Sequence, residues 1–381
     1  MPRGDMTASL AESREQRDCR FMAAAIRYSR RHLGLTGTNP SVATLIVAEQ
    51  GGQPVIVGRG VTALGGRPHA ETQALEEAGE KARGATAYVT LEPCAHHGKT
   101  PPCAEALIRA GIARVVGAAD DPDPRVAGRG YAMLREAGIE VVSGVLAEEA
   151  RQVLSGYLIR SEKKRTEVTL KLALSADGKI GRQGRGQVQI TGEIASRQVH
   201  MMRAEADAIL IGIRTALNDD PALTCRLPGL EHRSPARIVL DRHLRLPLNS
   251  TLVSSARRVP LYLTIASDCP VARREAYAEA GVQFIAIDSV DNDVALPELV
   301  EDLAAKGFTK LLVEGGAYTA SAFLNDGLVD RICLFVAPIR LGEGEEAVAA
   351  PVTPESIPQG FRLIRRERYG EDDYFEYVRE D

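Results

Sequence analysis

Residues 86–103 read TAYVTLEPCAHHGKTPPC, and this run combines a predicted strand with two cysteines. Apolar residues over 85–91 predict the strand, and Cys94 lies just past its end. Cys103 stands immediately before a helix expected over 104–110. Both cysteines are therefore expected next to helix starts, where the helix dipole favours thiolate over thiol.

A second motif, His69-Ala70-Glu71, opens a helix expected over 70–83. One imidazole and two thiolates make a three-ligand zinc site with the fourth position left for water, which is the catalytic arrangement. Zinc lowers the pKa of such a water to roughly 7. Glu71 is close enough in sequence to sit beside the metal and carry a proton from the water to a ring nitrogen and then to a leaving amine. This H-x-E…P-C…C pattern is the signature of zinc nucleobase deaminases.

Two alternatives remain open for these residues. One is a closed zinc knuckle with His96 or His97 as a fourth ligand, and the other is an ordinary histidine with two buried cysteines. The spacing of the cysteines bears on the substrate. Nucleic-acid deaminases carry two residues between them, whereas eight intervene here. The insert contains Lys99, which suits a small anionic substrate such as a phosphorylated nucleotide.

Composition limits the class of protein. A chain of 381 residues predicts two or three domains. The net charge of −4 argues against nucleic acid as the main partner. The chain contains no run of 18 apolar residues, so the sequence predicts no membrane span. The N-terminus lacks the apolar core of a secretory signal. Six sparse cysteines do not form a disulfide framework, so we expect a cytoplasmic protein.

The alternation of predicted elements gives the domain organisation. After a hairpin expected over 42–61, strands and helices alternate, which is typical of a layered α/β domain with a largely parallel sheet. Asp18 is the expected cap of the first helix. A charged run over 161–166 marks a boundary. We expect a disordered lead over 1–17, one domain over 18–163 and a second α/β domain over 164–381.

The second half carries weaker signals. A strand expected over 310–313 ends in Glu314-Gly315-Gly316, where a diphosphate can approach backbone N–H groups at a helix start. A tight turn explains the two glycines equally well. Arg203 and Arg226 are candidates to bind a phosphate, and surface solvation is the alternative for both.

At these motifs the chain resembles the bifunctional riboflavin-biosynthesis deaminase/reductase family. The matching runs are residues 86–103, NPSV at 39–42, DPDPRVAGRG at 121–130, KLALSADGK at 171–179, NDDPALTCR at 218–226 and VEGG at 313–316. The resemblance extends over nearly the whole chain from about residue 18. It implies a cytidine-deaminase-like N-terminal domain and a dihydrofolate-reductase-like C-terminal domain.

The resemblance also implies two consecutive reactions. The first is the hydrolytic deamination of 2,5-diamino-6-(5-phosphoribosylamino)pyrimidin-4-one, and the second is the NADPH-dependent reduction of the ribosyl group to a ribityl group. His69, Cys94 and Cys103 are expected to bind Zn2+, with Glu71 as the catalytic proton carrier. Among substrate-binding residues, Asn39 is expected to contact the pyrimidine and Lys99 to approach the phosphate.

For the reductase half, the resemblance assigns two groups of residues. The NADPH site is expected to include Ala173, Gln189, Thr215, Asp219, Gly315, Gly316 and Ala317. The substrate site is expected to include Gln187, Arg203, Leu223, Arg226 and Glu314. Family members often carry Ser-x-Trp where this chain has Gln187-Val188-Gln189, and the chain contains no tryptophan. Arg242 and Arg245 are candidates to bind the 2′-phosphate of NADPH.

Three functions are compatible with these observations. The first is the bifunctional enzyme, acting on a phosphorylated ribosylaminopyrimidine without a nucleic-acid or membrane partner, and expected by resemblance to form a homo-oligomer. The second is a deaminase with a non-catalytic second domain, which the missing Ser-x-Trp favours. The third is a tRNA or DNA deaminase, which the eight-residue cysteine gap and the negative net charge oppose.

Overall fold

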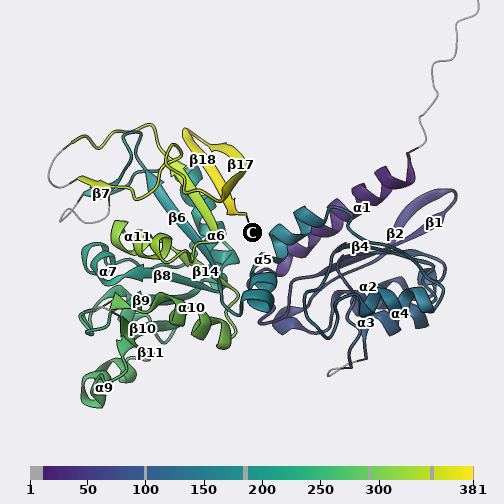
Figure 1. Cartoon of the computed structure of the whole chain (residues 1–381), viewed down its shortest axis with the longest axis horizontal. Coiled ribbons are helices and arrows are strands. Elements are labelled where there is room, and N and C mark those ends of the chain that lie inside the picture. Colours follow the sequence, from purple (N-terminus) through teal and green to yellow (C-terminus); the bar gives the residue numbers. More distant parts are fainter. Residues whose placement is uncertain (1–11, 98–100, 183–187, 291–292, 344–346, 381) are drawn as a thin grey trace, which may run out of the picture. The chain divides into compact units, whose positions relative to one another are not determined.

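The computed structural model describes residues 12–97, 101–182, 188–290, 293–343 and 347–380. The chain divides into two compact units, Met1–Glu162 and Lys163–Asp381. Each unit has its own sheet (Figure 1). Each unit also has its own apolar core. Most of the lead expected at the N-terminus lies outside the described residues.

The first unit contains a five-stranded sheet with the order β2-β1-β3-β4-β5. Strand β1 is antiparallel to both neighbours, whereas β3, β4 and β5 are parallel. The strands are β1 (Ala43–Gln50), β2 (Gln53–Val61), β3 (Thr86–Leu91), β4 (Arg114–Ala119) and β5 (Glu140–Val142). The expected hairpin is confirmed, because Gln50 pairs with Gln53 across its turn.

In the described part of the first unit, five α-helices cover this sheet. They are α1 (Arg14–Ser29), α2 (Ala70–Ala78), α3 (Cys103–Arg109), α4 (Arg129–Glu136) and α5 (Ala147–Lys163). Helices α1 and α5 lie along one side of the sheet, and α2, α3 and α4 lie on the other (Figure 1). Apolar residues of the strands fill the two layers between the sheet and the helices.

The start of α1 differs from the prediction. Ser13, not Asp18, caps the helix, because the Ser13 hydroxyl accepts the Gln16 N–H and the Gln16 side chain accepts the Ser13 N–H. Asp18 is buried inside the helix, where its carboxylate accepts two hydrogen bonds of 2.7 Å from Arg114 and one of 2.9 Å from the Tyr88 hydroxyl. Asp18 therefore ties α1 to strands β3 and β4.

Helix α2 packs against β2 without intervening side chains from the strand. A methyl group on Gly60 would lie 2.0 Å from the Ala70 carbonyl oxygen, and one on Gly58 would lie 2.1 Å from the Ala74 carbonyl oxygen. Both distances are far inside van der Waals contact, so only glycine fits at these two strand positions. The helix contributes only alanines to this seam, at 70, 74 and 78. Small residues on both sides thus set how closely the first turn of α2 approaches the sheet.

The second unit contains a nine-stranded sheet with the order β11-β10-β9-β8-β14-β6-β15-β18-β17. Neighbours from β11 to β15 are parallel, and β18 and β17 extend the sheet in antiparallel fashion. The strands are β6 (Glu167–Leu174), β8 (Ala208–Gly212), β9 (Ala236–Leu240), β10 (Leu261–Ala266), β11 (Gln283–Ile287), β14 (Lys310–Val313), β15 (Arg331–Val336), β17 (Phe361–Tyr369) and β18 (Asp372–Arg379).

Helices connect the parallel strands of this sheet. They are α6 (Glu193–Glu205), α7 (Ile213–Asp219), α8 (Thr251–Ser254), α9 (Val271–Glu279), α10 (Leu296–Ala305) and α11 (Ala317–Asn325). Two small sheets pair β7 (Lys179–Arg182) with β16 (Ala347–Ala349), and β12 (Ser289–Val290) with β13 (Asp293–Val294). The chain enters at β6, runs outward from β8 to β11, and returns through β14 between β8 and β6. Sheets with such a reversal bind ligands at the carboxyl ends of the central strands.

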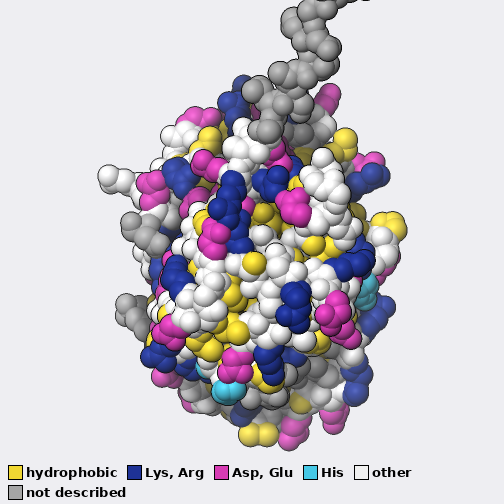
Figure 2. Space-filling view, turned by 90° about the vertical axis from the view of Figure 1, so that its right-hand side faces the viewer, with side chains coloured by type: hydrophobic (Ala, Val, Ile, Leu, Met, Phe, Trp, Pro, Cys, Tyr) yellow, Lys and Arg dark blue, Asp and Glu magenta, His cyan; other side chains and the backbone are white. Residues whose placement is uncertain are grey.

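The surface carries both signs of charge. On the face drawn in Figure 2, Lys and Arg side chains are interspersed with Asp and Glu side chains. Among the described residues, no helix has the length and apolar character needed to cross a membrane.

We predict that Gly60→Ala weakens both the first unit and its metal centre. The added methyl group must push α2 away from β2, which we expect to lower the free energy of unfolding by about 2–3 kcal/mol. Urea unfolding and bound-zinc content measure the two effects. Val55→Ala, at an exposed position of the same strand, is the matched control. Unchanged stability and zinc content in Gly60→Ala would show that the seam does not position the helix.

Candidate functional site

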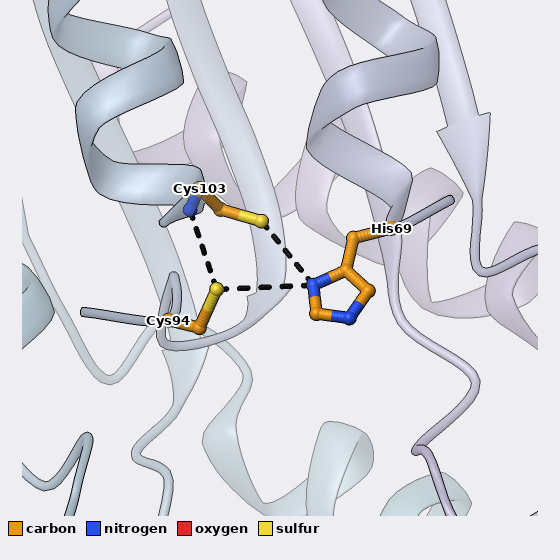
Figure 3. Close-up of side chains that lie close together, drawn as sticks. All are labelled: His69, Cys94 and Cys103. Carbon is orange, nitrogen blue, oxygen red and sulfur yellow. Dashed lines mark hydrogen bonds between the residues drawn. The ribbon is translucent and has the colours of Figure 1, made fainter. Parts of the chain in front are cut away.

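His69, Cys94 and Cys103 converge in the first unit (Figure 3). Their ligand atoms all lie within 4.8 Å of one another. His69 Nδ1 lies 3.3 Å from Cys103 Sγ and 3.8 Å from Cys94 Sγ. Among the described residues, neither His96 nor His97 belongs to this cluster, and His97 Nε2 instead lies 3.2 Å from Glu105. The arrangement therefore favours an open three-residue site over a closed knuckle.

Each of the three residues is placed by the start or end of an element. His69 is the N-cap residue of α2, and Cys103 is the first residue of α3. Cys94 follows β3, and its sulfur accepts the Cys103 backbone N–H at 3.2 Å. Glu92 fixes the approach to Cys94, because its buried carboxylate accepts backbone N–H groups at the start of α4, including that of Gly130 at 2.9 Å.

Contacts among these side chains shift their pKa values. The pKa of Cys94 is lowered to about 4, because the Cys103 thiol and backbone N–H and the His69 ring donate to its sulfur. The Cys94 sulfur also raises the pKa of His69. Cys103 holds its proton against Cys94, and its pKa is raised by that hydrogen bond and by burial. These shifts favour the thiolate form of Cys94, which is the form that binds a metal ion.

Glu71 lies in the first turn of α2 with only 4% of its surface exposed. Burial raises the pKa of its carboxyl group, and the negative charge of Cys94 raises it further. The charge of His69 and contact with the Cys103 thiol act in the opposite direction and lower the pKa, but they do not outweigh burial. A buried carboxyl group with a raised pKa, beside a metal-binding cluster, has the properties of a proton carrier.

The donor set fits zinc. One imidazole nitrogen and two sulfurs within a few ångström match the composition of three-ligand catalytic zinc sites. Softer sulfur ligands disfavour magnesium and calcium, which prefer oxygen. His69, Cys94 and Cys103 are thus the residues that would hold the ion.

Asn39 lies beside the segment that leads to His69. A methyl group on Gly66 would lie 2.2 Å from Asn39 Nδ2, and Gly66 has a φ of +90°. The Thr36 hydroxyl donates to the Asn39 carbonyl oxygen at 2.7 Å and fixes this loop. Asn39 is therefore placed next to the metal-binding segment, whereas Lys99 lies outside the described residues.

The second unit has a cavity of about 1040 Å³ at the carboxyl ends of β6, β8, β9 and β14. Its lining includes ten of the residues expected for NADPH and substrate: Ala173, Gln189, Arg203, Thr215, Asp219, Arg226, Glu314, Gly315, Gly316 and Ala317. The lining is strongly cationic, with seven basic and two acidic residues: Lys171, Arg182, Arg203, Arg214, Arg226, Arg242 and Arg245, against Asp219 and Glu314. The cavity is therefore suited to ligands with several phosphate groups.

Glu314 forms a charged cluster on the wall of this cavity. Arg203 donates to both carboxylate oxygens, at 2.8 and 3.0 Å, and Lys171 Nζ lies 3.4 Å away. Burial alone would raise the pKa of Glu314, but the two cations outweigh it and lower the pKa to about 2. Arg203 is thus neither solvated at the surface nor free to bind a phosphate with its whole guanidinium group. Arg226 is exposed, so its guanidinium group is accessible to a phosphate.

The remaining residues expected for the reductase site differ in where they lie. Leu223 is buried in the apolar core and does not line the cavity. Gln187 lies outside the described residues, and Gln189 donates to the Thr191 carbonyl oxygen at 2.8 Å. Thr215 supports the glycine turn, because its hydroxyl accepts the Gly316 N–H at 3.2 Å.

Sequence reasoning missed three residues of these sites. Glu92 stands two positions before Cys94. Its burial and its backbone partners at Gly128 and Gly130 arise from tertiary structure, so no local sequence pattern reveals them. Lys171 lies on the partly exposed face of β6 with Thr169 and Ala173, so the alternation of the strand gives no sign of its role. His200 lies three residues before Arg203 on α6, a spacing that places both side chains on one helix face.

Comparisons with known proteins cover both units. The family described as the cytidine and deoxycytidylate deaminase zinc-binding region matches residues 15–119. The family described as the RibD C-terminal domain matches residues 166–372. The zinc-binding match spans His69, Cys94 and Cys103, so it agrees with the cluster that the geometry identifies.

Full-length relatives match as well. The riboflavin biosynthesis protein RibD of Aquifex aeolicus is 39% identical over 327 residues, which cover 86% of this chain and 88% of the relative. The Escherichia coli RibD is also 39% identical, with coverages of 84% and 88%. The solved structure of Acinetobacter baumannii RibD is 35% identical with a TM-score of 0.81, covering 96% of this chain and all of that one.

A Thermotoga maritima structure extends the comparison. It is described as a diaminohydroxyphosphoribosylaminopyrimidine deaminase/5-amino-6-(5-phosphoribosylamino)uracil reductase. It is 31% identical with a TM-score of 0.81, and covers 96% of this chain and all of its own. The two-domain architecture expected from the sequence is therefore confirmed.

We predict that Cys94→Ser loses most of its bound zinc. Replacing a thiolate by a hydroxyl removes one of three ligands, so zinc should fall from about one ion per chain to a small fraction after dialysis. Elemental analysis of the purified protein measures this. Cys19→Ser, at a half-buried position on α1, is the matched control and should keep its zinc. Full zinc content in Cys94→Ser would exclude Cys94 as a ligand.

Proposed function

The chain belongs to the RibD family of bifunctional riboflavin-biosynthesis enzymes, which combine deaminase and reductase activities, and on this premise we propose its substrates and the residues that act on them. The first unit hydrolyses the amino group of 2,5-diamino-6-(5-phosphoribosylamino)pyrimidin-4-one. The second unit then uses NADPH to reduce the ribosyl group of the product to a ribityl group.

One observation carries this proposal: buried Glu71 lies in the helix turn that follows His69, beside the sulfurs of Cys94 and Cys103. A zinc ion held by these three residues would supply a Lewis acid that makes water nucleophilic near neutral pH. Glu71 accepts a proton from the attacking water and delivers it to the pyrimidine ring nitrogen. It then moves a second proton to the leaving amine, which departs as ammonia. Asn39 holds the pyrimidine in place.

The cationic cavity of the second unit supports the reductase step. NADPH would supply a hydride to the ribose C1, which ring opening exposes as an imine. The turn at Gly315 and Gly316, held by Thr215, presents the start of α11 to the cofactor diphosphate. Arg226 binds the substrate phosphate, and the Glu314 cluster orients the pyrimidine side of the substrate.

Arg242 and Arg245 support NADPH over NADH as the cofactor. Both follow β9 and line the cavity, and the backbone between them is fixed by Asp241, whose carboxylate accepts the Arg245 and Leu246 N–H groups. We assign these two arginines to the 2′-phosphate. The cytoplasmic location and the homo-oligomeric state stay predictions from the sequence.

Glu71→Gln tests the deaminase assignment. The amide cannot accept the proton, so we expect ammonia release from the diamino substrate to fall by about 10²–10⁴-fold. Bound zinc should stay at the wild-type level, and reduction of the deaminated intermediate should be unaffected. Coupled ammonia and NADPH assays measure both steps. Glu76→Gln, at an exposed position of the same helix, is the control. Wild-type ammonia release by Glu71→Gln would contradict the proposed role.

The double variant Arg242→Ala/Arg245→Ala tests the cofactor assignment. Loss of charge-assisted hydrogen bonds to the 2′-phosphate should weaken NADPH binding by about tenfold or more. NADH lacks this phosphate, so its affinity serves as the internal control and should barely change. Fluorescence titration with each nucleotide gives both dissociation constants. An equal loss of affinity for both nucleotides would contradict the assignment.

A further inference from the structure

His200 is a buried histidine on the cavity wall that the proposed chemistry does not use. Its Nδ1 accepts the backbone N–H of Arg226 at 3.3 Å. Arg203, three residues later on α6, donates to the Thr224 carbonyl oxygen at 3.2 Å. Two neighbouring side chains of α6 therefore hold the end of the loop that carries Arg226.

This 220–226 loop needs such anchors, because its backbone is strained. Asp220 and Leu223 have φ values of +37° and +55°, in the left-handed region that is unfavourable for residues other than glycine. The start of the loop is tied elsewhere, since the Asp220 carboxylate accepts the Thr251 N–H and hydroxyl, both at 2.8 Å. The far end depends on α6 and on Ser234, whose hydroxyl accepts the Cys225 N–H at 3.1 Å.

We propose that His200 is a positioning residue of the reductase site, which orients Arg226 toward the substrate phosphate by accepting its backbone N–H. The inference rests on the proposed function, because it presupposes that Arg226 binds that phosphate. Arg226 is exposed on the cavity wall, so its backbone is the part of the residue that the protein can fix. Without the acceptor, the Arg226 N–H is left unpaired and the end of the loop is free to shift.

The charges around His200 keep the ring neutral. Burial lowers its pKa, and Arg203 on the same helix and Arg226 on the loop lower it further, while Glu314 opposes them. Glu314 is itself neutralised by Arg203 and Lys171. A neutral ring can offer Nδ1 as an acceptor, whereas a protonated ring cannot.

A double-mutant cycle tests this inference. His200→Ala should raise the KM for the deaminated intermediate by about tenfold, because the Arg226 N–H loses its acceptor and the end of the loop is no longer fixed. NADPH affinity should stay at the wild-type value. In an Arg226→Ala background the same change should have little further effect, since the orientation of the missing guanidinium no longer matters. Arg197→Ala, at an exposed position of α6, is the control for helix stability.

Rescue and pH dependence separate positioning from simple packing. His200→Asn keeps an acceptor near the position of Nδ1, so its KM should return to within about twofold of the wild-type value. The wild-type KM should rise as the pH falls through the lowered pKa of His200, beyond the change that substrate phosphate ionisation causes. His200→Asn should lack that additional rise.

The outcomes distinguish this inference from the proposed function. If wild-type protein does not oxidise NADPH with the deaminated intermediate, the proposed function itself fails. If wild-type protein is active, two results overturn the role of His200: an unchanged KM in His200→Ala, or the same increase in KM with and without Arg226. Failure of His200→Asn to restore the KM also contradicts it.

Discussion

The close seating of helix α2 on strand β2 is the constraint on which the metal centre depends. Glycines at 58 and 60 leave backbone against backbone, and this sets the depth at which His69 and Glu71 enter the site. The other two ligands are then brought to the same point by different means. Cys94 follows a strand end held by the buried Glu92 carboxylate, and Cys103 begins a helix whose first N–H binds the Cys94 sulfur. The position of the metal-binding cluster thus depends on the packing of α2, β3 and α3.

The cavity of the second unit is built to hold several anionic groups. The return of the chain through β14 places the ends of four parallel strands together, and basic residues from these strands and their helices line the space. One buried carboxylate, Glu314, compensates part of that charge and fixes Arg203 and Lys171. Arg203 also reaches the strained loop next to Arg226, so the charge cluster and the substrate-binding loop are mechanically connected.

The sequence predicted the elements that have a strong pattern and missed those without one. Apolar strands and the His/Cys/Cys cluster were found because their signals are local or closely spaced in the chain. Strand β17 was missed because an arginine-rich edge strand lacks apolar alternation. Helix α7 was missed because, unlike the equally short α3, it is not followed by a glycine that marks its end. Asp18 was misassigned as a cap, since its buried partner Arg114 is 96 residues away. The burial of Leu223 and the pairing of Arg203 with Glu314 likewise depend on tertiary contacts that no local pattern reveals.

The central claim is that one chain deaminates first and reduces second. The most direct measurement follows ammonia and NADPH together in a single reaction of the full-length protein with the diamino substrate. The account predicts that ammonia appears first, that NADPH oxidation follows after a lag, and that about one NADPH is consumed per ammonia because each intermediate accepts one hydride. NADPH oxidation that precedes ammonia release, or that proceeds without it, would contradict the account.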